Sequence, residues 1–443
     1  MAMSRAKRVF AGAGANVINL LYVTLVTGLS VPVLTHAWGV RDYGLWVMLS
    51  ALPTYLALSD FGFSTAATND IAMNVARDEL DTAVQTFQSV WALNLLIGGG
   101  VVAAAVLACL GTAMFVGNAT ITLYASTALI LTIYAVACLL SRSFLGALRA
   151  TGNYAQGSFL NDTFQFVEGC ASLAAAYLGG GFLGAATALL AIRLLDILAL
   201  YGLLRSKVSW LPIGFRHASQ RTLKRLIGPA FGSMSIPISL ALNMQGVALV
   251  VGLAISPTAT AVITTSRTVS RIAVQVISAV NRALVPELSA ASAQGDHAAI
   301  QKIEKLNTVM LVGVAVPAAV FFGVFGSDLI GIWTGGQVAP PQIVVALLGL
   351  AMGIHSIWFF GTNLLSATNA HGRMATGLLP SAIVTVVLAK LGSDHWGLEG
   401  AAAAVAAGET LCLCWFFWVS RAQKINSTYK LHLQTDRHKI TLK

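Results

Sequence analysis

Apolar stretches of about 20 residues recur along the whole chain and are separated by short polar breaks. A helix needs about 20 apolar residues to cross the roughly 30 Å hydrocarbon layer of a membrane. The pattern therefore predicts an all-α protein with about twelve membrane-spanning helices. Their approximate ranges are 11–36, 44–66, 87–111, 119–141, 157–178, 183–204, 226–254, 258–285, 303–326, 342–367, 374–391 and 398–420.

The composition agrees with a polytopic membrane protein. Of 443 residues, 56% are hydrophobic and only 10% are charged, whereas soluble domains average about 25% charged residues. At the N-terminus Arg5, Lys7 and Arg8 precede an apolar run that continues to about Val33. This run is too long for the core of a cleaved signal peptide, so we interpret it as an uncleaved first helix.

Basic residues lie in alternate connections, as expected when they stay on the cytoplasmic side. The predicted outer connections contain only Arg41 and Lys390. The pattern places both termini in the cytoplasm and explains the net charge of +10 without a nucleic-acid partner. The predicted inner connections contain Arg77, Arg142, Arg149, Arg205, Lys207, Arg216, Arg221, Lys224, Arg225, Lys302, Lys305, Arg373 and the basic residues of 421–443.

The loop from Arg205 to Arg225 divides the chain near its middle, with six predicted helices on each side. Because each half has an even number of helices, both halves start on the same side of the membrane and are parallel repeats. Transporters with this arrangement have a central cavity with the substrate site between the halves. Short similarities at an offset of about 217 residues, such as 82–87 with 298–303, support the repeat. We predict halves at 1–210 and 226–422, a cytoplasmic linker at 211–225 and a basic tail at 423–443.

Two cytoplasmic connections, at about 67–86 and 287–302, are amphipathic. Each is expected to be a short helix at the inner membrane interface. A linker helix without a part in gating explains the pattern equally well.

The predicted helix 258–285 carries arginines well inside an apolar segment. At 1.5 Å per residue from Thr258, Arg267 lies about 14 Å and Arg271 about 20 Å from the outer entrance. Arg282 lies at the inner end, where its side chain can extend to water. Residues three and four apart share a helix face, so one polar stripe combines Thr264, Arg267, Arg271, Gln275, Ser278 and Arg282.

Placing an arginine at the middle of the membrane raises the free energy of insertion by at least about 2.5 to 3.5 kcal/mol. Its guanidinium stays charged and offers paired hydrogen bonds that suit phosphate oxygens. We therefore predict that Arg267 and Arg271 face water or an anion, with Gln275 and Arg282 beside them.

Other ionisable groups lie within the predicted spans. Glu168 and Arg193 are at similar depth on adjacent helices, which predicts an ion pair that Asp196 shares. His355 and Glu409 lie deep in the second half; proton transfer by Glu409 and plain hydrogen bonding between helices are both open. The candidate groups for ion coupling are Glu409, Glu168 and Asp60, although Asp60, near an inner helix end, is also typical of a structural residue.

Amide side chains mark the first helix of each predicted half. Asn16 and Asn19 lie on the first helix, and Asn243 and Gln245 on the seventh. Such residues often join helices, but a cavity lining for sugar contact is the alternative that two matching repeats favour.

Catalytic and metal-binding motifs are missing from the sequence. It has no Gly-x-x-x-x-Gly-Lys-Ser/Thr phosphate loop and no soluble domain large enough for a catalytic fold, so no built-in ATPase or other enzyme is expected. Five cysteines without paired spacing or further ligands indicate no metal site, and we expect no cofactor.

Short motifs resemble a known family. They are Gly39-Val40-Arg41-Asp42-Tyr43-Gly44-Leu45-Trp46, Leu58-Ser59-Asp60-Phe61-Gly62-Phe63 and Leu284-Val285-Pro286-Glu287-Leu288-Ser289. They are similar to those of bacterial O-antigen and polysaccharide flippases, within the multidrug, oligosaccharidyl-lipid and polysaccharide exporter superfamily.

The resemblance implies a multi-pass protein of the bacterial cytoplasmic membrane that moves a polyprenyl-pyrophosphate-linked oligosaccharide between leaflets, among membrane lipid and beside a polymerase and a chain-length regulator. It also implies a cavity in which Arg267 and Arg271 hold the pyrophosphate while Asn16, Asn19, Asn243 and Gln245 contact sugar. A cation-coupled multidrug exporter of the same superfamily is the first alternative. A membrane scaffold for polysaccharide assembly that transports nothing is the second.

Overall fold

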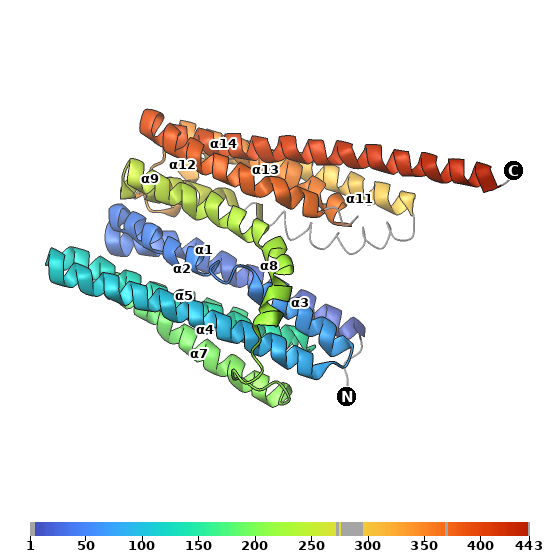
Figure 1. Ribbon diagram of the computed structural model, residues 1–443. Helices are drawn as coiled ribbons and strands as arrows, with labels where there is room; N and C mark the ends of the chain where they lie inside the picture. The colour runs from blue at the N-terminus through green and yellow to red at the C-terminus, as the bar shows by residue number, and fades with distance from the viewer. Residues whose placement is uncertain (1–4, 272–273, 276–295, 368–370, 442–443) are drawn as a thin grey trace. The chain divides into compact units, whose positions relative to one another are not determined.

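The computed structural model describes residues 5–271, 274–275, 296–367 and 371–441, which are helical apart from short turns and loops (Figure 1). Before residue 208 the elements are α1 (Arg5–Leu49), α2 (Ala51–Leu56), α3 (Phe63–Ala76), α4 (Leu80–Gly111), the π-helix η1 (Thr112–Val116), α5 (Ala119–Ala150), α6 (Tyr154–Tyr177) and α7 (Gly181–Lys207). After it come α8 (Gln220–Ala241), the π-helix η2 (Leu242–Gly246), α9 (Val247–Ala254), a helix over 257–271, α11 (His297–Met310), the π-helix η3 (Leu311–Ala315), α12 (Val316–Trp333), α13 (Gln342–Ala367) and α14 (His371–Thr441).

Eight described stretches are long and apolar enough to cross a membrane. Two of them, Leu20–Leu56 and Thr376–Arg421, contain a break at Gly39 and Gly397, so each provides two crossing segments. The other two predicted spans correspond to α6, which carries Asp162 and Glu168, and to the helix over 257–271, of which too short a stretch is described to cross a membrane. The predicted all-α polytopic architecture, with six segments on each side of the central loop, is confirmed.

Several predicted boundaries were wrong. The second span does not continue to residue 66, because the helix ends at Leu56 and a turn follows over 57–62. In that turn Phe61 (φ 49°) and Gly62 (φ 77°) are left-handed, and the Asp60 carboxylate accepts from the amides of Gly62 and Ser64, both at 3.1 Å. These bonds fix the start of α3.

The predicted interfacial helix at 67–86 is therefore two elements. Its first part belongs to α3, which ends at Ala76, and its last part opens the long spanning helix α4 at Leu80. Of the second predicted interfacial segment, 287–302, only the part from residue 296 is described, and there α11 begins at His297.

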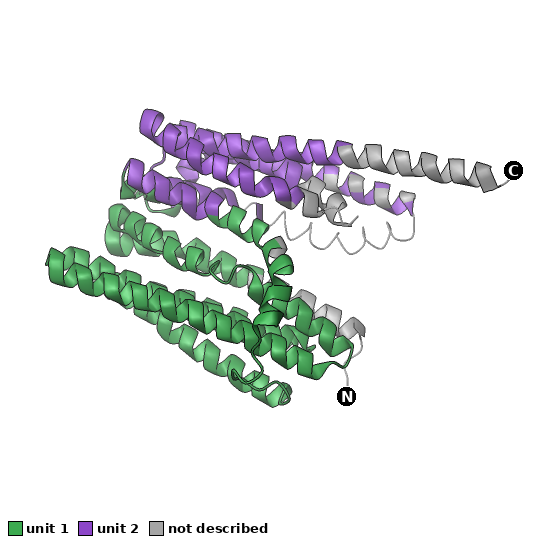
Figure 2. Cartoon of the chain, in the orientation of Figure 1, with its two compact units in different colours: residues 1–241, 256–261, 333–338 green, residues 242–255, 262–332, 339–443 purple. Residues whose placement is uncertain are grey.

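Contacts divide the chain into two compact units (Figure 2). Unit 1 comprises 1–241, 256–261 and 333–338, and unit 2 comprises 242–255, 262–332 and 339–443. The whole of α8 thus belongs with the N-terminal helices, and Leu226 and Ala230 are buried in the same apolar cluster as residues of α3, α4 and α5. The repeat boundary predicted in the loop at 211–225 stays a prediction.

The connection between α7 and α8 is packed into unit 1. Gln88, only 2% exposed, donates from Nε2 to the Pro212 carbonyl (3.0 Å) and accepts at Oε1 from the His217 amide (2.7 Å). The neighbouring Ser89 hydroxyl accepts from the Ser219 amide at 2.8 Å. The loop backbone is therefore hydrogen-bonded to the first turns of α4.

Unit 2 is organised around α13 and the two limbs of α14. The break at Gly397 (φ 58°) brings Gly392 and Gly400 so close that a Cβ on either would meet the other's carbonyl oxygen, at 2.5 and 2.1 Å. Small residues permit such close approach of helices in lipid. The limbs consequently run beside each other as an antiparallel pair.

Candidate functional site

The arginine at the centre of the predicted stripe is held by an amide. Arg267 lies on the 257–271 helix with 7% of its surface exposed. Its Nη1 donates to the Asn243 carbonyl at 2.8 Å, and its Nη2 donates to Asn243 Oδ1. Asn243 belongs to η2, where the wider π-helical turn changes the backbone hydrogen-bonding pattern. One residue therefore orients the guanidinium with both of its oxygens.

Glu409 is the described acid that acts electrostatically on both arginines, but neither arginine forms a close ion pair with it. Arg267 and Arg271 form no ion pair with the carboxylates that the structure describes, and the Arg271 side chain is exposed. Nearby on the same chain segment, Thr264 Oγ1 and Gln275 Oε1 are buried without a hydrogen-bond partner. The segment thus combines two positive charges with uncommitted polar atoms.

Glu409 on α14 is bound by α13. Its Oε2 accepts from Trp358 Nε1 at 2.9 Å and lies 3.0 Å from His355 Nδ1. The His355 ring stacks on Phe359 with centroids 5.5 Å apart. Glu409 is also within electrostatic range of Arg267. Of the two roles considered for Glu409 from the sequence, hydrogen bonding between helices is therefore observed. Proton transfer by Glu409 stays a prediction.

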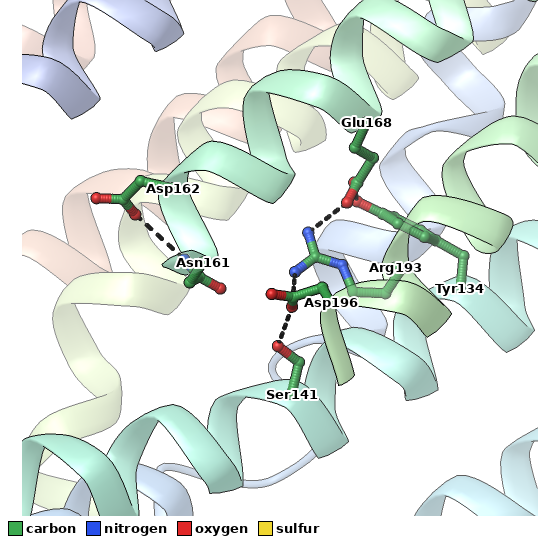
Figure 3. A network of polar contacts seen from close by, with 7 residues as sticks. All are labelled: Tyr134, Ser141, Asn161, Asp162, Glu168, Arg193 and Asp196. Carbon is green, nitrogen blue, oxygen red and sulfur yellow. Dashed lines mark hydrogen bonds and ion pairs between the residues drawn. The ribbon is translucent and has the colours of Figure 1, made fainter. Parts of the chain in front are cut away.

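A second buried polar cluster joins α5, α6 and α7 (Figure 3). Arg193 contacts Glu168 Oε2 at 2.7 Å and Asp196 Oδ2 at 3.0 Å. The Tyr134 hydroxyl donates to Glu168, and the Ser141 hydroxyl donates to Asp196 at 2.6 Å. The predicted ion pair, shared with Asp196, is confirmed.

The remaining predicted residues are spread over the fold. Asp60 holds the turn before α3, and Gln245 lies partly exposed in η2 near Asn243. Arg282 lies outside the described residues, as do the side chains of Asn16 and Asn19 on α1. The structure therefore brings Arg267 together with Asn243, while the roles of the other residues at a substrate site stay predictions.

The sequence of the chain matches a known family. A profile described as a polysaccharide biosynthesis protein matches residues 34–340, well over half of the chain. The chain belongs to this polysaccharide biosynthesis protein family. No curated protein matches it.

Solved structures show the fold of this family member. An inward-facing MATE-family multidrug resistance transporter of the MOP superfamily superposes with a TM-score of 0.69 at 15% identity, covering 97% of each chain. A MOP-superfamily transporter from Pyrococcus furiosus, described as having a binding pocket of reverse polarity, gives a TM-score of 0.57 at 16% identity and covers 95% of this chain and 98% of its own. A MATE transporter mutant from Vibrio cholerae gives 0.60 at 15% identity and covers 94% and 96%. The family member thus has the fold of MOP-superfamily transporters, as the sequence resemblance predicted.

Sequence reasoning missed several residues of this polysaccharide biosynthesis protein. Tyr134 and Ser141 are seven residues apart and therefore share one face of α5, which was a recognisable signal. Trp358 follows His355 by three residues and faces the same acid. Each was overlooked because a lone Tyr, Ser or Trp in an apolar span is usual.

Proposed function

We propose that this polysaccharide biosynthesis protein moves a polyprenyl-pyrophosphate-linked oligosaccharide from the inner to the outer leaflet of the bacterial cytoplasmic membrane. The observation that carries the proposal is the pair Arg267 and Arg271, which lies within a membrane helix and forms no described ion pair. A permanent charge at such depth is costly. An anionic head group that passes beside the pair offsets that cost.

The geometry of the pair suits a pyrophosphate. A guanidinium has five N–H donors, and Asn243 takes two of those of Arg267. The remaining donors of Arg267 and those of Arg271, which makes no hydrogen bond with the described residues, can bind phosphate oxygens, which accept paired, charge-assisted hydrogen bonds. Asn243 thereby fixes the direction of Arg267 without neutralising its charge.

The structural neighbours include multidrug transporters, so a cationic drug is the competing cargo. A cation requires an accessible acid, but the Glu409 carboxylate in the same unit is already bound by Trp358 and His355. The basic pair repels a cationic drug and attracts a pyrophosphate. A scaffold that transports nothing gives no reason for keeping two arginines without a described ion pair in a membrane helix.

Arg271 provides the sharper binding test, because its exposed side chain makes no described hydrogen bond that folding would lose. Geranylgeranyl pyrophosphate serves as the probe, with purified protein in detergent and binding followed by thermophoresis. A charge-assisted hydrogen bond contributes about 1.5–3 kcal/mol, so R271A should weaken binding about 10- to 100-fold, and R271K less. The matched control R216A removes an exposed loop arginine and should bind like wild type.

Transport itself is tested in cells that depend on this protein for surface polysaccharide. R271A and the double variant R267A/R271A should reach the membrane, abolish surface polysaccharide and leave lipid-linked units in the inner leaflet. Normal surface polysaccharide in the double variant, or equal probe affinity in R271A and R216A, would contradict the proposal.

A further inference from the structure

The buried cluster of α5, α6 and α7 has an unbalanced formal charge. It contains one guanidinium, that of Arg193, and two carboxyl groups, those of Glu168 and Asp196 (Figure 3). These three side chains are 4%, 5% and 0% exposed. If both carboxyl groups are ionised, the cluster carries a net charge of −1 where solvent cannot compensate it.

The described residues around the cluster supply no second cation. From α5 the cluster is faced by Tyr134, Cys138 and Ser141, which are neutral donors. Arg142, next on α5, donates instead to the Ala57 carbonyl at 3.0 Å. Arg193 is the one cation among the described charges that act on the two carboxyl groups.

The described contact of α6 with α1 at this level is apolar. On the side of α1, Val26 packs so closely that a Cβ on Gly169 would lie 2.6 Å from its side chain. Asp162 lies two turns earlier on α6, where its Oδ1 accepts from Asn161 Nδ2 at 3.2 Å (Figure 3), and it is not among the described charges that act on Glu168 or Asp196. The charge count therefore rests on three groups.

Two polar atoms of the cluster have neither a hydrogen bond nor an ion-pair contact. Asp196 Oδ2 accepts from both Arg193 and Ser141, while Asp196 Oδ1 and Arg193 Nε are buried without a hydrogen bond. A buried carboxylate oxygen without a donor is costly. Because the two carboxyl groups share one cation, the state in which both are ionised is also disfavoured.

We propose that Tyr134, Glu168, Arg193 and Asp196 form a proton-binding site, which holds one proton on its two carboxyl groups at neutral pH and exchanges it with solvent. With the proton bound, the cluster contains one carboxylic acid, one carboxylate and one guanidinium and is neutral. On release the acid becomes a carboxylate and the proton passes to water. The site lies within unit 1 and does not depend on the identity of the cargo.

Infrared spectroscopy of the purified full-length protein tests the proposal without a substrate. Wild type at neutral pH should show the carbonyl stretch of a protonated carboxylic acid, and the band should shift when H₂O is replaced by D₂O. E168Q and D196N should each lose this band, because the carboxylate that remains is balanced by Arg193. E79Q, which changes an exposed carboxylate at the start of α4, should retain it.

In R193Q the protonated carboxyl band should grow rather than disappear. Without the guanidinium both carboxyl groups become protonated, so the band should grow about twofold. Gel filtration reports whether each variant folds, and any one folded variant is sufficient for the assignment. A wild-type spectrum without a protonated carboxyl band, a band that E168Q and D196N both keep, or a band that never shifts in D₂O would overturn the proposal.

Discussion

At the scale of single residues, the neutral partner of Arg267 is the informative choice. An aspartate at position 243 could make the same two contacts, but it would cancel the charge that the proposed cargo requires. An asparagine orients the guanidinium and leaves its charge intact. Both oxygens belong to one residue of the π-helical turn η2.

Replacing Asn243 with Asp should therefore separate orientation from charge. N243D keeps the shape of the side chain and gives Arg267 an acidic counter-ion, so stability in detergent should be maintained or raised. Affinity for geranylgeranyl pyrophosphate should fall about tenfold, which corresponds to the smallest free energy that a charge-assisted hydrogen bond typically contributes. N243A adds no charge and should bind better than N243D; the reverse order would contradict this account.

Arg193 differs from Arg267, because its charge is balanced by bound carboxyl groups and stabilises the fold. R193L leaves two carboxyl groups buried without their shared partner, and removing one member of a buried ionic cluster typically costs about 3–5 kcal/mol. The thermal melting temperature of the detergent-solubilised protein should fall markedly. R205L, at an exposed position near the end of α7, is the control and should melt like wild type.

At the scale of helices, close approaches at glycine decide how neighbouring segments pack. A Cβ on Gly44, in the segment of α1 after the break at Gly39, would lie 1.8 Å from the Pro257 carbonyl oxygen. Pro257 opens the helix that carries the arginine pair. Gly44 thus permits α1 to contact the start of that helix, which explains the glycine in the sequence motif around it.

A pair of glycine substitutions on α1 tests this contact. G44A should destabilise the protein by about 1–3 kcal/mol, as expected for overpacking against an atom that cannot rotate away. G28A adds a methyl group where nothing lies within 4 Å and should be neutral or stabilising by up to about 1 kcal/mol. Equal melting temperatures for the two variants would show that the Gly44 contact is unimportant.

At the scale of the whole molecule, apolar length and the spacing of breaks predicted nearly every spanning segment. The 57–62 turn was missed because Leu56, Leu58, Phe61 and Phe63 continue the apolar run, and only the backbone conformation reveals the cap that Asp60 provides. At the candidate site, depth alone identified Arg267 and Arg271. The bond from Arg267 to Asn243 joins residues 24 positions apart on different helices, and helical periodicity relates positions within one helix only.

The predicted sidedness can be measured directly. In a variant without the five native cysteines, K390C should react with a membrane-impermeant maleimide in spheroplasts, because Lys390 is predicted to lie outside. R216C, in the central loop, should react only after permeabilisation. The opposite pattern would reverse the assigned orientation. The cysteines to be replaced are Cys109, Cys138, Cys170, Cys412 and Cys414.

The bonds from Gln88 and Ser89 to the 208–219 loop have a practical consequence for anyone who divides this protein. A long polar connection is the usual place to cut a chain or to insert a tag, since slack backbone tolerates both. Here the cut ends would still be fastened to α4 through the Pro212 carbonyl and the His217 and Ser219 amides. Protease should nick the loop slowly, whereas a bulky insertion would have to break buried hydrogen bonds before it could be accommodated.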